Sequence, residues 1–124
     1  MEQDSKIWLD KAEEDFDIAR FNIEGGKIEA GIFFLQQSVE KALKALHIKQ
    51  QGKLLRSHDL LLLSKTVNAP PEIQKYCKEL SPAYYYTRYP DAKVQEDIGI
   101  ISESFVESTE DILKWVKTKL YSKN

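Results

Sequence analysis

The sequence is poor in the residues that build disulfides and metal sites. Its 124 residues include one cysteine, Cys77, and two histidines, His47 and His58. A single cysteine excludes a disulfide within the chain, and two histidines beside it leave too few soft ligands for a structural zinc site. We therefore expect no metal and no cofactor, and we expect Cys77 to be a buried or half-buried thiol in a helix.

Long apolar segments are missing as well. No run approaches the roughly 20 apolar residues that cross a bilayer. The N-terminal residues 1–6 have neither the basic start nor the apolar stretch of a secretory signal. This predicts a cytoplasmic protein. With 42% hydrophobic residues, the chain fits one domain, residues 1–124, around a single core.

The common catalytic signatures do not occur in the chain. It has no glycine-rich phosphate loop, no Gly-x-Ser-x-Gly elbow and no His-Glu-x-x-His pair. Acidic runs such as Glu13-Glu14-Asp15 are typical of solvated helix faces, because neighbours on a helix point in different directions. Asp15 lies at the edge of an apolar face, and we expect it to pair with a lysine of the second helix. No residue is predicted to be catalytic.

Apolar residues recur at steps of three and four, which predicts helices and no strands. The fold class that follows is all-α, an up-and-down bundle of about four to five helices. The expected helices cover residues 5–24, 28–50, 58–67, 72–80 and 92–120, with breaks at Gly25-Gly26, Gln51-Gly52 and Asn68-Ala69-Pro70-Pro71. The residues expected at the centres of the longest apolar seams are Leu35, Val39, Ile98, Ile101, Phe105 and Ile112.

A polar row accompanies the apolar stripe of the helix predicted over 28–50. The row consists of Gln36, Gln37, Glu40, Lys41, Lys44 and His47. Lys44 and His47 are expected on the solvent face, whereas Lys41 is expected near the mouth of the bundle. His58 stands at the start of the third helix, behind a capping Ser57, where we expect it to cap or pack rather than to catalyse.

Charge is distributed unevenly along the chain. Residues 1–26 carry eight acids and three bases, a net charge of −5, while residues 27–58 carry six bases and two acids, a net charge of +4. Such asymmetry either guides an anionic ligand to one face or pairs two helices with each other. It is too mild for a general nucleic-acid binder.

Residues 84–91, YYYTRYPD, hold four of the six tyrosines and one of three arginines. One interpretation is a nucleotide site, in which Arg88 binds phosphate, Tyr86 and Tyr89 stack on a base, and Asp91 orients Arg88 or contacts a ribose. The other is a structural plug at the end of the bundle, with the rings inside and the hydroxyls in water. Lys41 and His58 complete the predicted ligand-binding set.

Four segments in series resemble the small prokaryotic HEPN domain proteins. They are WLDKAEED at residues 8–15, FLQQSVEKALKA at 34–45, SHDL at 57–60 and RYPD at 88–91. The resemblance implies an up-and-down helical bundle that forms a homodimer and binds nucleotides. It also implies a minimal nucleotidyltransferase as partner, in a toxin–antitoxin-like pair.

The chain departs from this family at the ribonuclease motif, an Arg followed by a His after four to six residues. No histidine follows Arg20, Arg56 or Arg88 at that spacing, so acid–base cleavage of RNA would lack its imidazole. The prediction is therefore a nonenzymatic nucleotide-binding or partner-binding protein. Two alternatives stay open: a diverged ribonuclease that brings Arg88 and His58 together, and a purely structural homodimer with surplus apolar surface at Trp8, Phe34 and Trp115.

Overall fold

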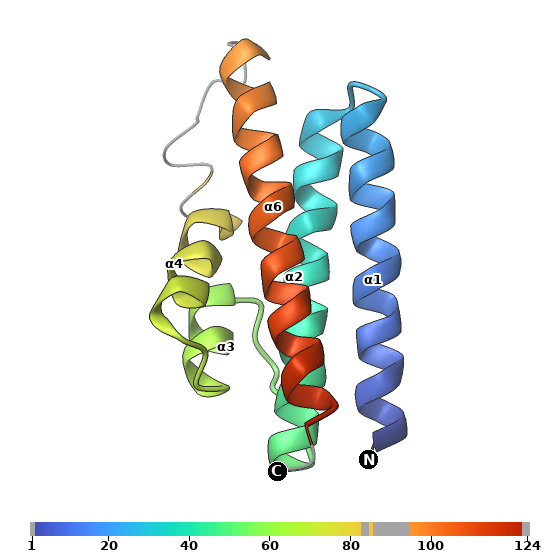
Figure 1. Ribbon diagram of the computed structural model, residues 1–124, viewed down its shortest axis with the longest axis vertical. Helices are drawn as coiled ribbons and strands as arrows, with labels where there is room; N and C mark the ends of the chain where they lie inside the picture. The colour runs from blue at the N-terminus through green and yellow to red at the C-terminus, as the bar shows by residue number, and fades with distance from the viewer. Residues whose placement is uncertain (1, 83–84, 86–94, 123–124) are drawn as a thin grey trace.

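The computed structural model describes residues 2–82, 85 and 95–122, and this part of the chain is helical without strands. Its helices are α1 (Glu2–Glu24), α2 (Ile28–Gln51), α3 (Leu60–Thr66), α4 (Pro71–Leu80) and α6 (Gln95–Leu120). The long helices α1, α2 and α6 lie side by side, and the short α3 and α4 pack against one side of them (Figure 1). The predicted all-α bundle is confirmed. None of the described helices combines the length and the hydropathy that crossing a bilayer requires.

The turn between α1 and α2 is built by glycine, as the sequence predicted. Gly26 has a φ of 84°, in the left-handed region that other residues avoid. Gly31, near the start of α2, faces α1 so closely that a Cβ atom there would come within 2.3 Å of the Ile23 side chain. The first two helices therefore pack closely just after the turn that joins them.

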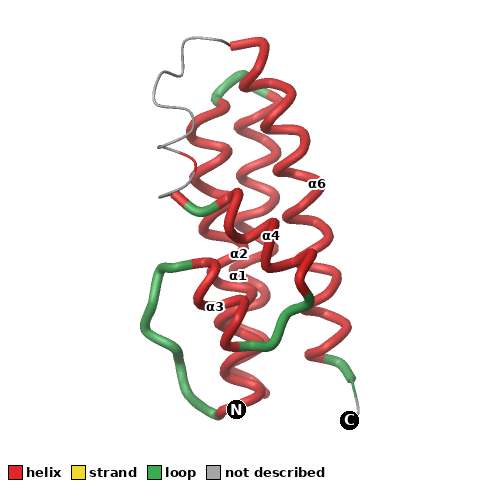
Figure 2. Tube along the Cα trace, turned by 90° about the vertical axis from the view of Figure 1, so that its left-hand side faces the viewer, coloured by secondary structure: helices red, strands yellow, loops and turns green. Residues whose placement is uncertain are grey.

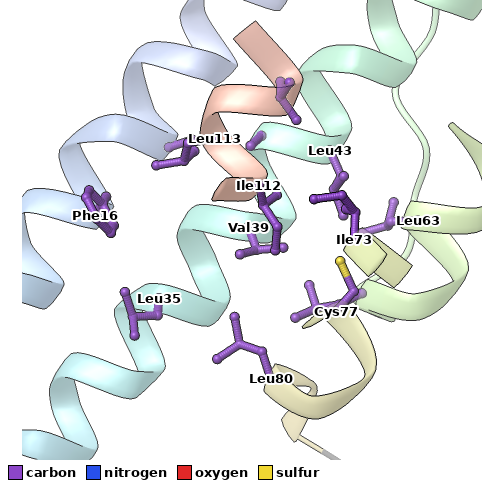
Figure 3. Packing of buried hydrophobic residues seen from close by; sticks show 14 of the residues in the cluster. Phe16, Leu35, Val39, Leu43, Leu63, Ile73, Cys77, Leu80, Ile112 and Leu113 are labelled. Carbon is purple, nitrogen blue, oxygen red and sulfur yellow. The ribbon is translucent and has the colours of Figure 1, made fainter. Parts of the chain in front are cut away.

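Helix α2 occupies the centre of the bundle, because it contacts α1, α3 and α6. Its apolar stripe packs against residues of α4 and α6 in one core (Figure 3). Of the residues predicted at the seam centres, Leu35, Val39, Phe105 and Ile112 are buried. Ile101 is only partly buried, so its predicted place in the core centre is wrong. The side chain of Ile98 lies outside the described residues.

The α2–α3 connection, residues 52–59, is here called the strap. It begins at Gly52, whose φ of 74° and N–H bond to the Ile48 carbonyl close the end of α2. Figure 2 shows the strap as the longer green segment that returns from the end of α2 towards α3. Contacts at both of its ends tie it to α2, and they are described with the site below.

Helix α3 starts later than predicted. Asp59, not Ser57, is its N-cap, because the Asp59 carboxylate accepts a hydrogen bond from the Leu62 N–H at 3.1 Å. Ser57 instead accepts from the N–H of Asp59. His58 is consequently a residue of the strap and not of the helix. Helix α4 begins at Pro71, one residue before the predicted range 72–80, and proline in the first turn sacrifices no helical hydrogen bond.

Candidate functional site

The polar row of α2 is buried, which contradicts the expected solvent exposure of Lys44 and His47. Lys44 retains 5% and His47 retains 3% of its accessible surface. The strap explains the burial of His47, because it runs back over this side of α2 and its Lys53 carbonyl lies 2.8 Å from His47 Nδ1. A carbonyl only accepts hydrogen bonds, so His47 Nδ1 carries a proton. Helical periodicity could not reveal this cover, because it comes from a segment without a periodic pattern.

A buried charged group lies at the centre of this row. Glu40 Oε2 accepts hydrogen bonds from Lys44 Nζ at 3.1 Å and from His58 Nδ1 at 3.0 Å. Trp8 of α1 covers the other side, with its ring centre 5.8 Å from Lys44 Nζ. A buried ammonium needs a partner to offset its lost hydration, and Glu40 and the Trp8 ring supply that partner.

His58 is exposed and yet held in place. Its side chain keeps 89% of its accessible surface, while the Glu40 side chain that binds it keeps 10%. It neither caps α3 nor packs in the core, so the capping or packing role expected from the sequence is wrong. The structure instead places an imidazole in solvent whose Nδ1 is fixed by a carboxylate of the bundle.

Lys41 forms the ion pair with Asp15 that the sequence predicted. The Nζ and Oδ2 atoms are 2.5 Å apart, and the pair joins α2 to α1. Ser38 supports the same contact, since its hydroxyl donates to the Ala12 carbonyl at 2.7 Å. Lys41 was predicted to bind ligand, but Asp15 neutralises its charge, so Lys41 contributes little free positive potential to a ligand.

The strap also carries cations that sequence reasoning did not single out. Lys53 and Arg56 are exposed, and neither forms an ion pair with another described residue. With His58 they place three basic side chains within six residues of one segment. In the sequence, the net charge of +4 over residues 27–58 was the feature that indicated a positively charged segment here. The spacing of Glu40 and Lys44, four apart on one helix, was the signal for the buried pair.

Most of the tyrosine-rich segment lies outside the described residues, including Tyr86, Arg88, Tyr89 and Asp91. The described exception is Tyr85, which is buried and meets Phe105 of α6 edge to face, with ring centres 6.1 Å apart. This one ring packs as the plug interpretation expects. The predicted roles of the other four residues remain predictions.

Other reactive groups offer no second site in the described part of the chain. There, no three His, Cys, Asp or Glu side chains gather as metal ligands. Cys77 is buried in α4, as expected, and burial raises the pKa of its thiol to about 12, while a hydrogen bond with Ser64 partly opposes the shift. A thiol protonated at neutral pH is a poor nucleophile.

Comparison with known proteins agrees with the helical architecture. A profile of the HEPN domain matches residues 5–119. Among solved structures, ST0689, an archaeal HEPN homologue, is 30% identical with a TM-score of 0.74, and the match covers 94% of this chain and 97% of that one.

A second solved structure, TT1696 from Thermus thermophilus, is 27% identical with a TM-score of 0.78, covering 93% of this chain and 97% of that one. No curated protein sequence matches the chain. The profile match spans nearly the whole sequence, and the first solved structure carries the same family in its description. The chain therefore belongs to the HEPN domain family.

Proposed function

We propose that the protein is a nonenzymatic, cytoplasmic HEPN module that binds a nucleotide. The observation that carries the proposal is the strap, on which the exposed imidazole of His58 is fixed by Glu40. Two exposed cations, Lys53 and Arg56, belong to the same short segment. A fixed polar group next to permanent positive charge suits a ligand that combines phosphate with hydrogen-bonding groups.

The strap is suited to binding because its backbone position is held by the bundle. His47 holds it near one end and Glu40 holds it near the other. Binding residues concentrate on loops that a rigid scaffold positions, since such loops lose little entropy when a ligand binds. The buried partners of the strap thus support recognition by Lys53, Arg56 and His58.

The proposal retains the sequence-predicted residues Arg88, Tyr86, Tyr89 and Asp91 as further ligand contacts. These four residues are included in the proposal because of their residue types alone, since they lie outside the described residues. A homodimer and a minimal nucleotidyltransferase partner, in a toxin–antitoxin-like pair, belong to the same proposal and rest on the family resemblance.

Calorimetry with ATP tests the nucleotide-binding proposal. We expect the double substitution Lys53→Ala/Arg56→Ala to weaken ATP binding by about a hundredfold or more, because each of the two charge-assisted hydrogen bonds to phosphate contributes about 1.5–3 kcal/mol. Arg88→Ala is expected to weaken binding by about 1.5–3 kcal/mol for the same reason. Lys27→Ala, which removes one exposed lysine in the turn at the opposite end of α2, is the net-charge control for Arg88→Ala. Absence of ATP binding by the wild-type protein at millimolar concentration would refute the proposal.

One observation favours a second function, the diverged ribonuclease. A carboxylate that binds Nδ1 of an exposed imidazole is an arrangement that acid–base enzymes also use. This function requires metal-independent cleavage of single-stranded RNA that is lost in His58→Ala. We expect no cleavage by the wild-type protein, because the family spacing of Arg and His is absent.

A further inference from the structure

The hydrogen bond to Glu40 determines which nitrogen of His58 carries the proton. A carboxylate accepts hydrogen bonds, so Nδ1, 3.0 Å from Glu40 Oε2, is the donor. In the neutral imidazole only one nitrogen bears hydrogen, and Nε2 then has a free lone pair. Free histidine prefers the other tautomer, with hydrogen on Nε2. The contact with Glu40 therefore converts the outer nitrogen of His58 from a donor into an acceptor.

Glu40 can impose this tautomer because it is itself held. Its carboxylate is bound by Lys44, and the side chains of Glu40 and Lys44 keep only 10% and 6% of their accessible surface. The Lys44 ammonium also lies over the Trp8 ring, 5.8 Å from its centre. A carboxylate accepts hydrogen bonds and has no hydrogen to donate, so the hydrogen in the contact between Glu40 and His58 belongs to the imidazole.

An acceptor at Nε2 can form a hydrogen bond only with those groups of a nucleotide that donate a hydrogen. Phosphate oxygens at neutral pH are acceptors and give His58 Nε2 no hydrogen. Amino groups occur on some bases and not on others, whereas a ribose hydroxyl donates in every ribonucleotide. Lys53 and Arg56 of the strap remain available for the phosphates. The ribose 2′-hydroxyl is thus a donor that complements this nitrogen whatever the base, and it is the one donor of the sugar that a 2′-deoxyribonucleotide lacks.

We infer that Glu40 is a positioning residue, which fixes His58 so that Nε2 accepts a hydrogen bond from the 2′-hydroxyl of a ribose, and that the site therefore prefers ribonucleotides to 2′-deoxyribonucleotides, which lack this hydroxyl. The inference rests on the proposed nucleotide-binding function and adds its sugar specificity. It gives the buried charged pair of Glu40 and Lys44 a role in positioning His58.

The tautomer can be measured without any ligand. A long-range proton–nitrogen NMR spectrum reports the two ring nitrogens of His47 and His58 separately, and His58→Asn assigns the signals. We expect His58 to carry hydrogen on Nδ1 in the wild-type protein. In Glu40→Leu/Lys44→Met, which removes both buried charges together with the acceptor for Nδ1, we expect the Nε2–H tautomer to prevail. A wild-type His58 with hydrogen mainly on Nε2 would overturn the inference.

Sugar preference provides the second measurement. We expect the wild-type protein to bind ATP about five- to tenfold more tightly than 2′-deoxy-ATP, the range of one hydrogen bond with a neutral group. His58→Asn and Glu40→Leu/Lys44→Met should bring that ratio close to one, whereas Lys53→Ala should weaken both ligands and leave the ratio unchanged. Equal wild-type affinity for the two ligands refutes the sugar specificity alone. Failure to bind either ligand refutes the proposed function and the specificity with it.

Discussion

At the scale of single residues, the buried pair of Glu40 and Lys44 is the main departure from an ordinary amphipathic helix. Both side chains lie on α2, four residues apart, beneath the strap and Trp8. Burying two charges costs hydration that their attraction rarely exceeds, so such a pair seldom adds net stability. Its presence is better explained by the position that it gives to His58.

The energetic asymmetry of this pair leads to a prediction about stability. Glu40→Gln should reduce the free energy of unfolding by about 3–5 kcal/mol, because it leaves the Lys44 ammonium buried without a counter-charge. Glu40→Gln/Lys44→Met should regain most of that loss, since neither charge is then buried. Urea denaturation of Glu40→Gln, Lys44→Met and the double variant completes the cycle. Equal losses in Glu40→Gln and in the double variant would show that Lys44 is not held by Glu40.

Cys77 gives the folded protein a predicted sensitivity to high pH. Burial raises the pKa of its thiol from the ordinary 9.0 to about 12. Between these values the unfolded chain has lost the proton and the folded protein retains it, so the stability that burial provides below about pH 9 is lost as pH rises.

The wild-type protein should therefore lose stability relative to Cys77→Ala above about pH 9. The slope should not exceed about 1.4 kcal/mol per pH unit, the value for one proton. Chemical denaturation at steps from about pH 7 to about pH 10.5 measures the difference, in which the titration of lysines and tyrosines cancels. A difference that stays constant over this range would contradict the burial of the thiol.

At the scale of helices, positions of the same apolar seam in α6 differ in how deeply they are buried. Ile101 and Ile112 belong to the same apolar seam. The structure buries Ile112 completely and leaves Ile101 partly exposed. Periodicity identifies the face of a helix that points inward, but how deeply each position lies depends on where the neighbouring helices end.

This difference predicts unequal effects of truncation. Ile112→Ala should reduce the free energy of unfolding by about 2–5 kcal/mol, because the surrounding side chains of α2 and α4 cannot fill the cavity. Ile101→Ala, the matched control on the same helix, should reduce the free energy of unfolding by clearly less, since water can reach part of the site. Urea denaturation of both variants tests the order. A larger loss for Ile101→Ala would place the core centre one turn or more nearer the start of α6.

At the scale of the whole molecule, the sequence was sufficient to predict the helices. It was insufficient to predict which polar side chains of α2 are buried by the strap. The glycine turn, the Pro71 start and the Asp15–Lys41 pair follow from local rules of helix ends and charge pairing. The burial of Lys44 and His47 does not, because it depends on the path of the strap. Nor could residue spacing show that His58 meets Glu40, since loop residues follow no period.

Self-association is the prediction that concerns the molecule as a whole. The family resemblance implies a homodimer, and three large apolar side chains, Phe21, Phe33 and Ile100, are 78%, 48% and 70% exposed. They belong to the parts of α1, α2 and α6 near the α1–α2 turn (Figure 1). We expect light scattering to give about twice the chain mass of 14.4 kDa at micromolar concentration. Phe21→Glu/Ile100→Glu should yield the monomer, because a buried apolar contact would then have to accommodate charge. Ile7→Glu, at the opposite end of α1, should remain dimeric, whereas a wild-type mass of 14.4 kDa would exclude the dimer.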